Sequence, residues 1–296
     1  MAHLLQPDVI DFSAYMQETD TAHNVRSAAD YADQVTDYFH GEELHRGCML
    51  PWKKTHDKLG FLPGEVTLWG GMSGHGKSAI LGQACTEFAR TGKRVVIASM
   101  EMKPMITLAR MCRQEYGRVP SVEAIQKFHA WTDGLIWIYD QQGAVKSAQM
   151  LAVLRYCVDV IKADHFVIDS LMKCGMAEDD YTAQKHFVDQ LCAIAMDANM
   201  HIHLVAHSRK TKDEFTPPGK MDVKGTGSIT DQVSNVITVC RNKKKEADAS
   251  EGIYRGTDPD CLLICDKQRN GEWEGKIGLF FNPERMRFEE TQGAGF

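Results

Sequence analysis

The stretch Gly71–Ser78 constrains the fold of this chain more than any other, because it fits the phosphate-loop pattern G-x-x-x-x-G-K-[ST]. The preceding residues Glu65–Trp69 predict a strand, and apolar residues at near-helical spacing in Ala79–Ala89 predict a helix. The N–H groups and dipole at a helix N-terminus favour a bound anion, and glycines let the backbone approach it. The sequence therefore predicts a nucleoside triphosphate site; the alternative is a glycine-rich turn before a helix.

Two side chains of this loop have predicted roles. Lys77 is expected to reach the β- and γ-phosphates, and the Ser78 hydroxyl to bind Mg²⁺. The expected cofactors are therefore ATP, or another nucleoside triphosphate, and Mg²⁺. The residues predicted to surround the phosphates are Gly71, Ser73, Gly74, His75, Gly76, Lys77, Ser78 and Ala79.

The composition is that of an ordinary soluble globular protein, with 43% hydrophobic and 25% charged residues among 296. No apolar run is long enough to span a membrane, and the first residues lack the features of a secretory signal. Nine scattered cysteines without a C-x-x-C pair favour buried thiols in a reduced cytosol over a disulfide framework. Because the formal net charge is −6, any contact with nucleic acid must come from a local basic patch.

From Gly60 onward, predicted strands alternate with predicted helices, which is typical of an α/β fold with a mostly parallel sheet flanked by helices. Further strands are expected at Arg94–Ser99, Gly134–Tyr139, His165–Ser170, His201–Ala206 and Val233–Cys240. Helices are expected at Pro104–Tyr116, Ser147–Lys162 and Thr182–Asp197, and a hairpin at Cys261–Lys267 and Lys276–Phe281. The stretch Ser208–Ser228 predicts a long loop, and long loops in compact domains are usually functional.

The N-terminal residues divide into two parts. Residues 1–20 show no clear periodicity and are expected to form a flexible tail. Thr21–Glu43 predicts an amphipathic helix that packs either on its own domain or on a neighbouring subunit. We therefore expect a tail at 1–20, a linker helix within 21–46 and a nucleotide-binding domain at 47–296.

Two carboxylates follow predicted strands. Asp169 ends an apolar strand about ninety residues after the phosphate loop, where a second Mg²⁺ ligand is expected; the alternative is a cap on the next element. Glu101 follows the strand that ends at Ser99, and could orient and deprotonate a water that attacks the γ-phosphate. By itself a strand-end glutamate is a weak signal.

Three histidines near one strand suggest a metal site, but no further His or Cys lies at zinc spacing. His201 and His203 share a strand face, and His207 lies past the end of that strand. We therefore expect His207 to contact the γ-phosphate rather than a metal.

Two basic segments lie outside the phosphate loop. Lys267 and Arg269 project to the same side of an extended chain and could reach a phosphate across a subunit interface. The alternative, a solvated basic hairpin tip, is favoured on spacing alone. The loop Arg209–Lys224 has a modest excess of basic residues and suits either phosphate contacts to a single strand or plain solvation.

Taken together, these motifs resemble the DnaB-like family of hexameric replicative helicases, which includes the Twinkle and phage primase-helicase motors. The similarity extends over roughly residues 45–290, with the motifs in the same order. The residues that carry it are Gly60–Glu65, Gly71–Ser78, Ser99–Met102, Val167–Ser170, Val205–Lys210, Gly225–Ser228 and Lys267–Gly271.

The resemblance implies roles that spacing does not. Glu101 corresponds to the catalytic base, Asp169 to the magnesium carboxylate and His207 to the γ-phosphate sensor. Lys267 and Arg269 correspond to a pair donated in trans to the neighbour's ATP. The remaining implied residues are Gln232 as a second sensor, and Arg241 and Phe281 as the pair that sandwiches the base.

The resemblance also implies a DNA interface in a central channel, formed by Ser170–Ala183 and by the loop that ends near Gly227. The linker helix corresponds to one that docks on the adjacent protomer. The residues expected to contact DNA are Lys173, Arg209, Lys210, Lys212, Lys220, Lys224, Gly225 and Thr226.

The implied function is that of a RecA-like ATPase in a homo-oligomeric ring, expected to be a hexamer, that moves 5′ to 3′ on single-stranded DNA and unwinds duplex. Primase, polymerase or loader are implied partners, without any membrane, in the cytoplasm of a bacterial host if the gene is phage or plasmid encoded. About fifty residues precede the motor, too few for a primase domain, so a stand-alone motor is expected. Two other functions stay open: a recombinase filament, and an ATP-gated clamp on single-stranded DNA without unwinding.

Overall fold

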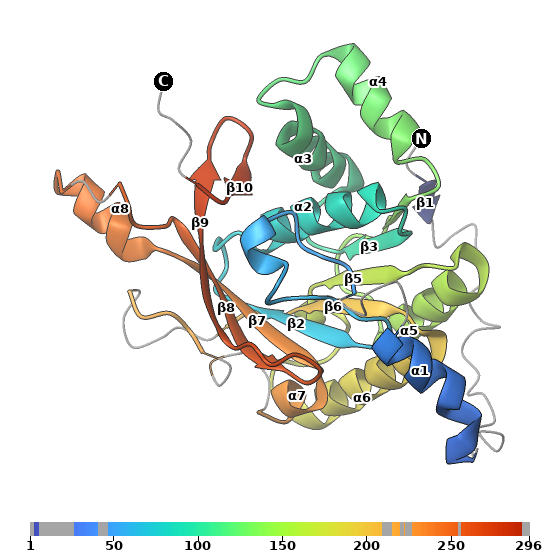
Figure 1. Cartoon of the computed structure of the whole chain (residues 1–296). Coiled ribbons are helices and arrows are strands. Elements are labelled where there is room, and N and C mark those ends of the chain that lie inside the picture. Colours follow the sequence, from blue (N-terminus) through green and yellow to red (C-terminus); the bar gives the residue numbers. More distant parts are fainter. Residues whose placement is uncertain are drawn as a thin grey trace.

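The computed structural model describes residues 3–5, 27–40, 47–208, 215–219, 222, 227–253 and 256–291, with a twisted mixed sheet at its centre (Figure 1). In this part of the chain, ten strands take the spatial order β1-β4-β3-β5-β6-β2-β7-β8-β9-β10. Along this order, neighbours are parallel as far as β7 and antiparallel beyond it. The strands are β1 His3–Leu5, β2 Val66–Gly70, β3 Val95–Ser99, β4 Ile136–Tyr139, β5 His165–Asp169, β6 His201–Val205, β7 Asn235–Arg241, β8 Cys261–Gln268, β9 Gly275–Asn282 and β10 Arg287–Glu289.

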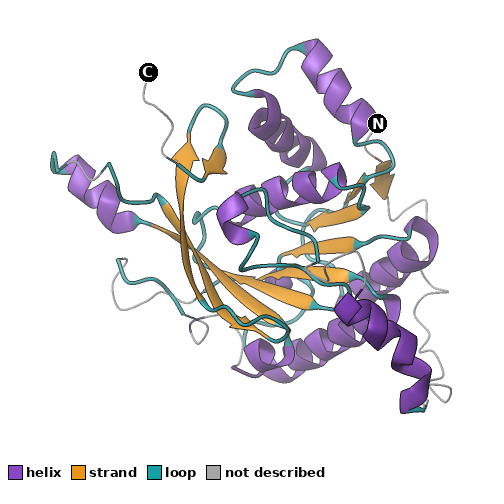
Figure 2. Cartoon of the chain, in the orientation of Figure 1, coloured by secondary structure: helices purple, strands orange, loops and turns teal. Residues whose placement is uncertain are grey.

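Helices cover both faces of the sheet (Figure 2). The helices are α1 Ala32–His40, α2 Lys77–Arg90, α3 Pro104–Tyr116, α4 Val122–Trp131, α5 Ser147–Tyr156, α6 Tyr181–Ala198, α7 Gly227–Gln232 and α8 Lys243–Ser250. One face carries α2, α3 and α4, and the other carries α5, α6 and α7, whereas α1 and α8 lie outside both layers (Figure 1). Among the described helices, none combines the length and the apolar character needed to cross a membrane.

The central strands are buried along their whole length, as expected for a parallel sheet with helices on both faces. Their apolar side chains form two cores. One lies under α2–α4 and includes Ile80, Phe88 and Met111. The other lies under α5 and α6 and includes Leu154 and Leu191.

The strand register brings the carboxyl ends of the central strands to one edge of the sheet. β2 lies between β6 and β7, where Trp69 pairs with Val205 and Ile237. Ser99 of β3 pairs with Asp169 of β5. The segments that follow β2, β3, β5 and β6 therefore meet at this edge, which is where ligands bind in open α/β sheets.

The predicted fold class and the predicted alternation of strands and helices are confirmed. The prediction for α3 matches both of its bounds, and the helix predicted at Ser147–Lys162 is α5 followed by a π-helical turn at Cys157–Ile161. The sequence analysis did not predict β1, α4, α7, α8 and β10, and α7 begins within the predicted loop Ser208–Ser228. Of these, β1 lies within the segment expected to be a flexible tail, and it pairs in parallel with β4.

The predicted linker helix is present in part. A short 3-10 turn at Ala28–Tyr31 leads into α1, and the ends of the predicted range Thr21–Glu43 lie outside the described residues. The residues from Ser27 to His40 are exposed wherever their exposure is described, and Phe39 reaches 71%. Among the described residues of one chain, the apolar side chains of this segment are therefore exposed to solvent.

Candidate nucleotide-binding site

The phosphate loop joins β2 to α2 and has a backbone that requires glycine at two positions. Gly71 has a φ of +139°, and a Cβ there would lie 2.4 Å from the Val239 carbonyl oxygen. Gly76 has a φ of +95° directly before α2, and a Cβ there would lie 3.0 Å from the Phe288 ring. Because the first N–H groups of a helix have no partner within that helix, the start of α2 at this loop suits a bound anion.

The Lys77 side chain lies inside this loop and is only 5% exposed. Its Nζ donates to the carbonyl oxygens of Gly71 at 2.8 Å and Met72 at 3.0 Å. Burial lowers the pKa of Lys77 to about 8, although the nearby carboxylates of Asp169 and Glu101 favour its charged form. The loop therefore holds a desolvated amine whose protonation a bound phosphate would favour.

Ser78 and Asp169 form the second feature of the site, with the Ser78 hydroxyl donating to Asp169 Oδ2 at 2.7 Å. Burial raises the pKa of the Asp169 carboxyl, and the hydrogen bond from Ser78 opposes that shift. A hydroxyl and a carboxylate side by side are hard oxygen ligands of the kind that Mg²⁺ binds alongside phosphates. The pair therefore fits the predicted Mg²⁺ site.

Glu101 and His207 lie beside these groups. Glu101 Oε1 accepts a hydrogen bond from the Ser170 hydroxyl at 3.0 Å and lies 3.5 Å from His207 Nε2. The other ring nitrogen of His207, Nδ1, is 3.5 Å from Lys77 Nζ. The structure thus brings the predicted base and the predicted sensor together around the end of the phosphate loop.

These residues line one cavity of about 670 Å³. Its far end has the predicted base-sandwich pair, Arg241 from β7 and Phe281 from β9. The Arg241 guanidinium contacts the Glu246 carboxylate of α8. Asp260 accepts the backbone N–H of Phe281 at 2.8 Å and forms an ion pair with Lys245 at 2.8 Å. Contacts to α8 therefore anchor both predicted walls of the base slot.

Sequence reasoning missed several residues of this cavity. Phe288 of β10 packs between Gly76 and Phe281, with its ring centroid 5.2 Å from that of Phe281. The Ser208 hydroxyl accepts the Gly71 N–H at 2.9 Å. The cavity is also lined by Arg110, Glu246, Asp260 and Met286. Those on the β9–β10 hairpin carried no local signal, because only the three-dimensional fold brings that hairpin beside the loop.

His75 has a structural contact within the loop, since its Nδ1 accepts the backbone N–H of Arg241 at 3.2 Å. Burial lowers the pKa of His75, and the charge of Lys77 lowers it further. A neutral imidazole therefore ties the phosphate loop to the base-binding strand β7.

Three predicted catalytic residues do not line the cavity of their own chain. Lys267 Nζ donates to the carbonyl oxygens of Thr230, Asp231 and Val233, at the C-terminal end of α7. The Arg269 guanidinium donates to Asp231 O at 3.3 Å and Gln232 O at 3.2 Å.

The side chain of Gln232, the third of these residues, reaches α6, where it contacts Asp189 and Lys185 O. Within one described chain, these three residues therefore form a separate group around α7.

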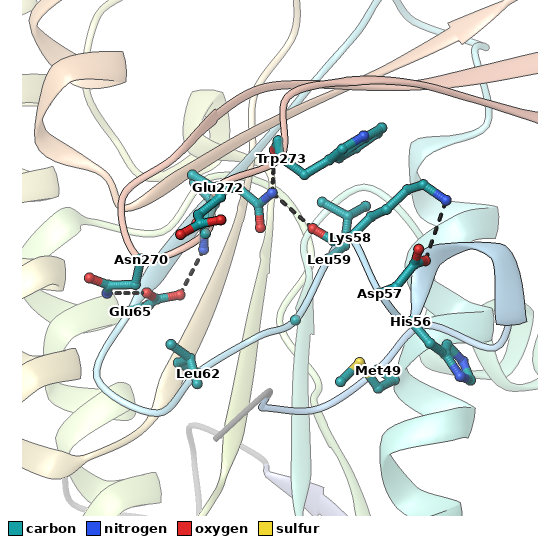
Figure 3. A pocket seen from close by; sticks show the side chains of 14 residues that line it. Met49, His56, Asp57, Lys58, Leu59, Leu62, Glu65, Asn270, Glu272 and Trp273 are labelled. Carbon is teal, nitrogen blue, oxygen red and sulfur yellow. Dashed lines mark hydrogen bonds and ion pairs between the residues drawn. The ribbon is translucent and has the colours of Figure 1, made fainter. Parts of the chain in front are cut away.

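A second cavity, of about 530 Å³, lies at the other end of β2 (Figure 3). Glu65 accepts hydrogen bonds from Asn235 at 2.8 Å and Asn270 at 2.6 Å. Gln268 Nε2 donates to the carbonyl oxygens of Lys58, at 2.9 Å, and Trp273. These bonds fix the tip of the β8–β9 hairpin against the start of β2.

The predicted DNA contacts are described for one residue only. Lys173 ends a 3-10 turn after β5, and its carbonyl oxygen accepts the Val145 N–H at 2.8 Å. The other predicted contacts lie outside the described residues: Arg209, Lys210, Lys212, Lys220, Lys224, Gly225 and Thr226.

His165, His201 and His203 are buried in the core under α2. His203 Nε2 lies 3.2 Å from His165 Nδ1, and His203 Nδ1 accepts the Trp69 indole N–H at 3.2 Å. Burial lowers the pKa of all three rings, His165, His201 and His203. Among the described residues, no group of three or more His, Cys, Asp or Glu side chains could hold a metal ion.

A phosphate loop, a strand-end carboxylate and a mostly parallel sheet define this chain as a P-loop protein with the RecA-like fold. The family model of the DnaB-like helicase C terminal domain matches residues 55–290. The chain therefore belongs to that family, as its motifs predicted.

Known proteins similar to this chain agree with the assignment. The Twinkle homolog protein, chloroplastic/mitochondrial, of Arabidopsis thaliana is 23% identical over 270 residues, which cover 83% of this chain and 37% of that protein. The chain thus spans little more than a third of that relative. A solved ATPase domain superposes with a TM-score of 0.74 at 15% identity, covering 91% of this chain and all of that one. A DnaB-like replicative helicase, solved in a study of its interactions with primase, superposes with a TM-score of 0.69 at 14% sequence identity. That match covers 91% of this chain and 68% of the helicase chain.

Proposed function

We propose that this chain is the motor of a ring-shaped helicase that hydrolyses ATP, or another nucleoside triphosphate, between its subunits, moves along single-stranded DNA and unwinds duplex. The observation that carries the proposal is the distribution of the predicted site between two places. The cavity has the phosphate loop, both carboxylates and His207, while Lys267 and Arg269 lie at α7. A second copy that presents these two cations to the cavity completes the site.

The chemistry follows from the groups around the phosphate loop. Glu101 takes the proton from the attacking water, and Lys77 neutralises charge on the β- and γ-phosphates. Ser78 and Asp169 would hold Mg²⁺, which supplies further positive charge at the β- and γ-oxygens. Cations from the neighbour, Lys267 and Arg269, then stabilise the charge that develops as the γ-phosphoryl group is transferred.

The link to DNA runs through His207. This residue lies within 3.5 Å of both Glu101 and Lys77, and the chain continues from it directly into segment 209–226. Loss of the γ-phosphate changes what His207 can contact, and thereby shifts the segment that follows it. The basic residues of that segment that are expected to contact DNA then move with it. Lys173, in the turn after β5, is a further proposed DNA contact.

The exposed face of α1 favours an oligomer. Phe39 and Val35 of α1 are 71% and 52% exposed, and Tyr31 of the preceding turn is also exposed. Apolar helix faces of this kind are usually covered by a partner. We propose that α1 docks on an adjacent copy within a hexamer, that the ring works in the cytoplasm, and that primase, polymerase or loader are its further partners.

Arg269→Ala tests the proposal. We expect DNA-stimulated hydrolysis to fall by about 10³-fold or more, the usual cost of losing an arginine finger, while binding of a fluorescent nucleotide is largely retained. The control is Lys127→Ala, which removes an exposed cation on α4. Wild-type turnover by Arg269→Ala would overturn the trans role.

Unwinding of a forked duplex by the wild-type protein separates a motor from a clamp. Electron microscopy with single-stranded DNA separates closed rings from recombinase-like filaments. Rings that unwind the fork support the proposal, and filaments or a fully active monomer contradict it.

A further inference from the structure

The tip of the β8–β9 hairpin is fixed to the start of β2 by one buried carboxylate (Figure 3). Glu65 is 4% exposed, and each of its oxygens accepts an amide N–H: Oε2 from Asn235 and Oε1 from Asn270. Asn235 also donates to Thr67 of β2 at 3.1 Å. The carboxylate therefore ties Asn270, the residue after Arg269, to two neighbouring central strands.

The same tip is held on its other face by Lys267 and Arg269 themselves. Side chains alternate along β8, so Gln268 faces the Glu65 cavity and donates to Lys58 O, while its two neighbours face α7. When the two cations reach out to a neighbour's nucleotide, they give up their bonds to the α7 carbonyls. The side-chain bonds on the Glu65 face then hold the tip together with the backbone bond from Arg269 N–H to Ser234 O at 2.9 Å.

We propose that Glu65 is a positioning residue, which holds the hairpin tip so that Lys267 and Arg269 meet the nucleotide of the adjacent copy. The inference rests on the proposed function, because it assumes that these cations act in trans. Its physical basis is the steep dependence of catalysis on placement, since a shift of about 1 Å in a catalytic group can cost about 10²-fold in rate. Burying a carboxylate is also costly unless both oxygens are paired, so a stable Glu65 requires the tip to be in place.

Asn270→Ala is the main test, because Asn270 is exposed and its removal leaves the core intact. We expect kcat for DNA-stimulated hydrolysis to fall at least about tenfold, with the KM for nucleotide within about twofold of wild type. Glu65→Ala should behave in the same way. Glu65→Gln should retain near-wild-type kcat, because an amide can still pair with Asn235 and with a turned Asn270 side chain.

The matched control is Glu272→Gln, which removes an exposed carboxylate from the lining of the same cavity. It should leave kcat unchanged. An equal loss of kcat in this variant would show that the charge of the cavity, and not the bond to Asn270, matters, and would overturn the proposal.

Mixed rings separate a positioning role from simple damage. Lys77→Ala copies hydrolyse very little but carry an intact tip, so mixing them with Asn270→Ala copies should restore hydrolysis above the sum of the two. The same mixture with Arg269→Ala copies should do likewise. If the Arg269→Ala mixture fails, the trans arrangement itself is wrong. If it succeeds and the Asn270→Ala mixture fails, the role of Glu65 is wrong.

Discussion

The two cavities at the ends of β2 use their polar groups in different ways. At the carboxyl end, Lys77 bonds to loop carbonyls, and Asp169 bonds to a hydroxyl that fits a Mg²⁺ ligand. At the amino end, Glu65 has an amide on each carboxylate oxygen. The first set consists of bonds that a phosphate and a cation can replace, whereas the second is already satisfied. One end of the strand is thus built to exchange partners, and the other to keep them.

Of the changes at the two ends of β2, Lys77→Ala should have the largest effect, and it should reduce activity without reducing stability. We expect hydrolysis to fall by at least about 10²–10³-fold, because the developing phosphate charge loses its nearest protein cation. The free energy of unfolding should stay within about 1 kcal/mol of wild type, since the free chain gains little from a desolvated amine. Steady-state hydrolysis and urea denaturation measure the two quantities. A large loss of stability would contradict the view that the polar groups at the carboxyl end of β2 serve function and not stability.

Nucleotide binding should weaken as the pH rises through the pKa of Lys77. Burial lowers that pKa to about 8, so the side chain is a cation below pH 8 and neutral above it. Because phosphates require the cation, affinity should fall by up to about tenfold per pH unit above 8. Titration of a fluorescent nucleotide from pH 7 to 9.5 measures this, and Lys77→Ala should lack the slope. A flat wild-type profile would show that Lys77 is not the group being titrated.

Asn235→Ala should affect stability at the opposite end. Removal of this buried amide leaves one oxygen of Glu65 and the hydroxyl of Thr67 without their donor. The free energy of unfolding should fall by about 1–3 kcal/mol, while the KM for nucleotide is unchanged. Urea denaturation measures the loss, and Glu272→Gln at the same cavity should show none. An increase in the KM for nucleotide with no loss of stability would show that Asn235 serves nucleotide binding and not the stability of this end of β2.

Glu246→Ala should give the smallest effect, at the base end of the nucleotide cavity. The half-exposed ion pair to Arg241 is expected to contribute about two- to fivefold to nucleotide affinity. Inorganic tripolyphosphate lacks a base, so its inhibition constant should not change. If nucleotide and tripolyphosphate lost affinity equally, Glu246 would instead contribute to binding of the phosphates.

The sequence predicts the centre of the fold well because buried parallel strands carry continuous apolar runs. β5 and β6 were predicted to within one residue, and Asp169 and His207 follow from the rule that strand ends meet at one edge. Of the helices that were missed, α4 had a usable signal. Ser121 caps its N-terminus and accepts the Ala124 N–H at 3.1 Å.

The rest of the site depends on contacts between distant segments. α8 has the sequence KKKEADAS, which shows no apolar periodicity, and its one signal is the N-cap Asn242, which accepts the Lys245 N–H at 3.0 Å. The role of Glu246 was not predictable. Phe288 reaches the phosphate loop only because β9 and β10 fold back over α2. The bonds of Lys267 and Arg269 to α7 likewise join segments more than thirty residues apart in the sequence, here the end of β8 and the C-terminal end of α7.

The short length of β2 has a consequence for how two nucleotide sites would be connected. Its five residues, about 17 Å of extended chain, separate Glu65 from the loop that grips phosphate. In a closed ring these two ends of the strand would face different subunit interfaces. Each copy would then connect the nucleotide that it binds with the nucleotide that it helps its neighbour to hydrolyse. In the oligomer proposed above, a tilt of β2 on nucleotide release would therefore also move the hairpin tip that serves the adjacent copy.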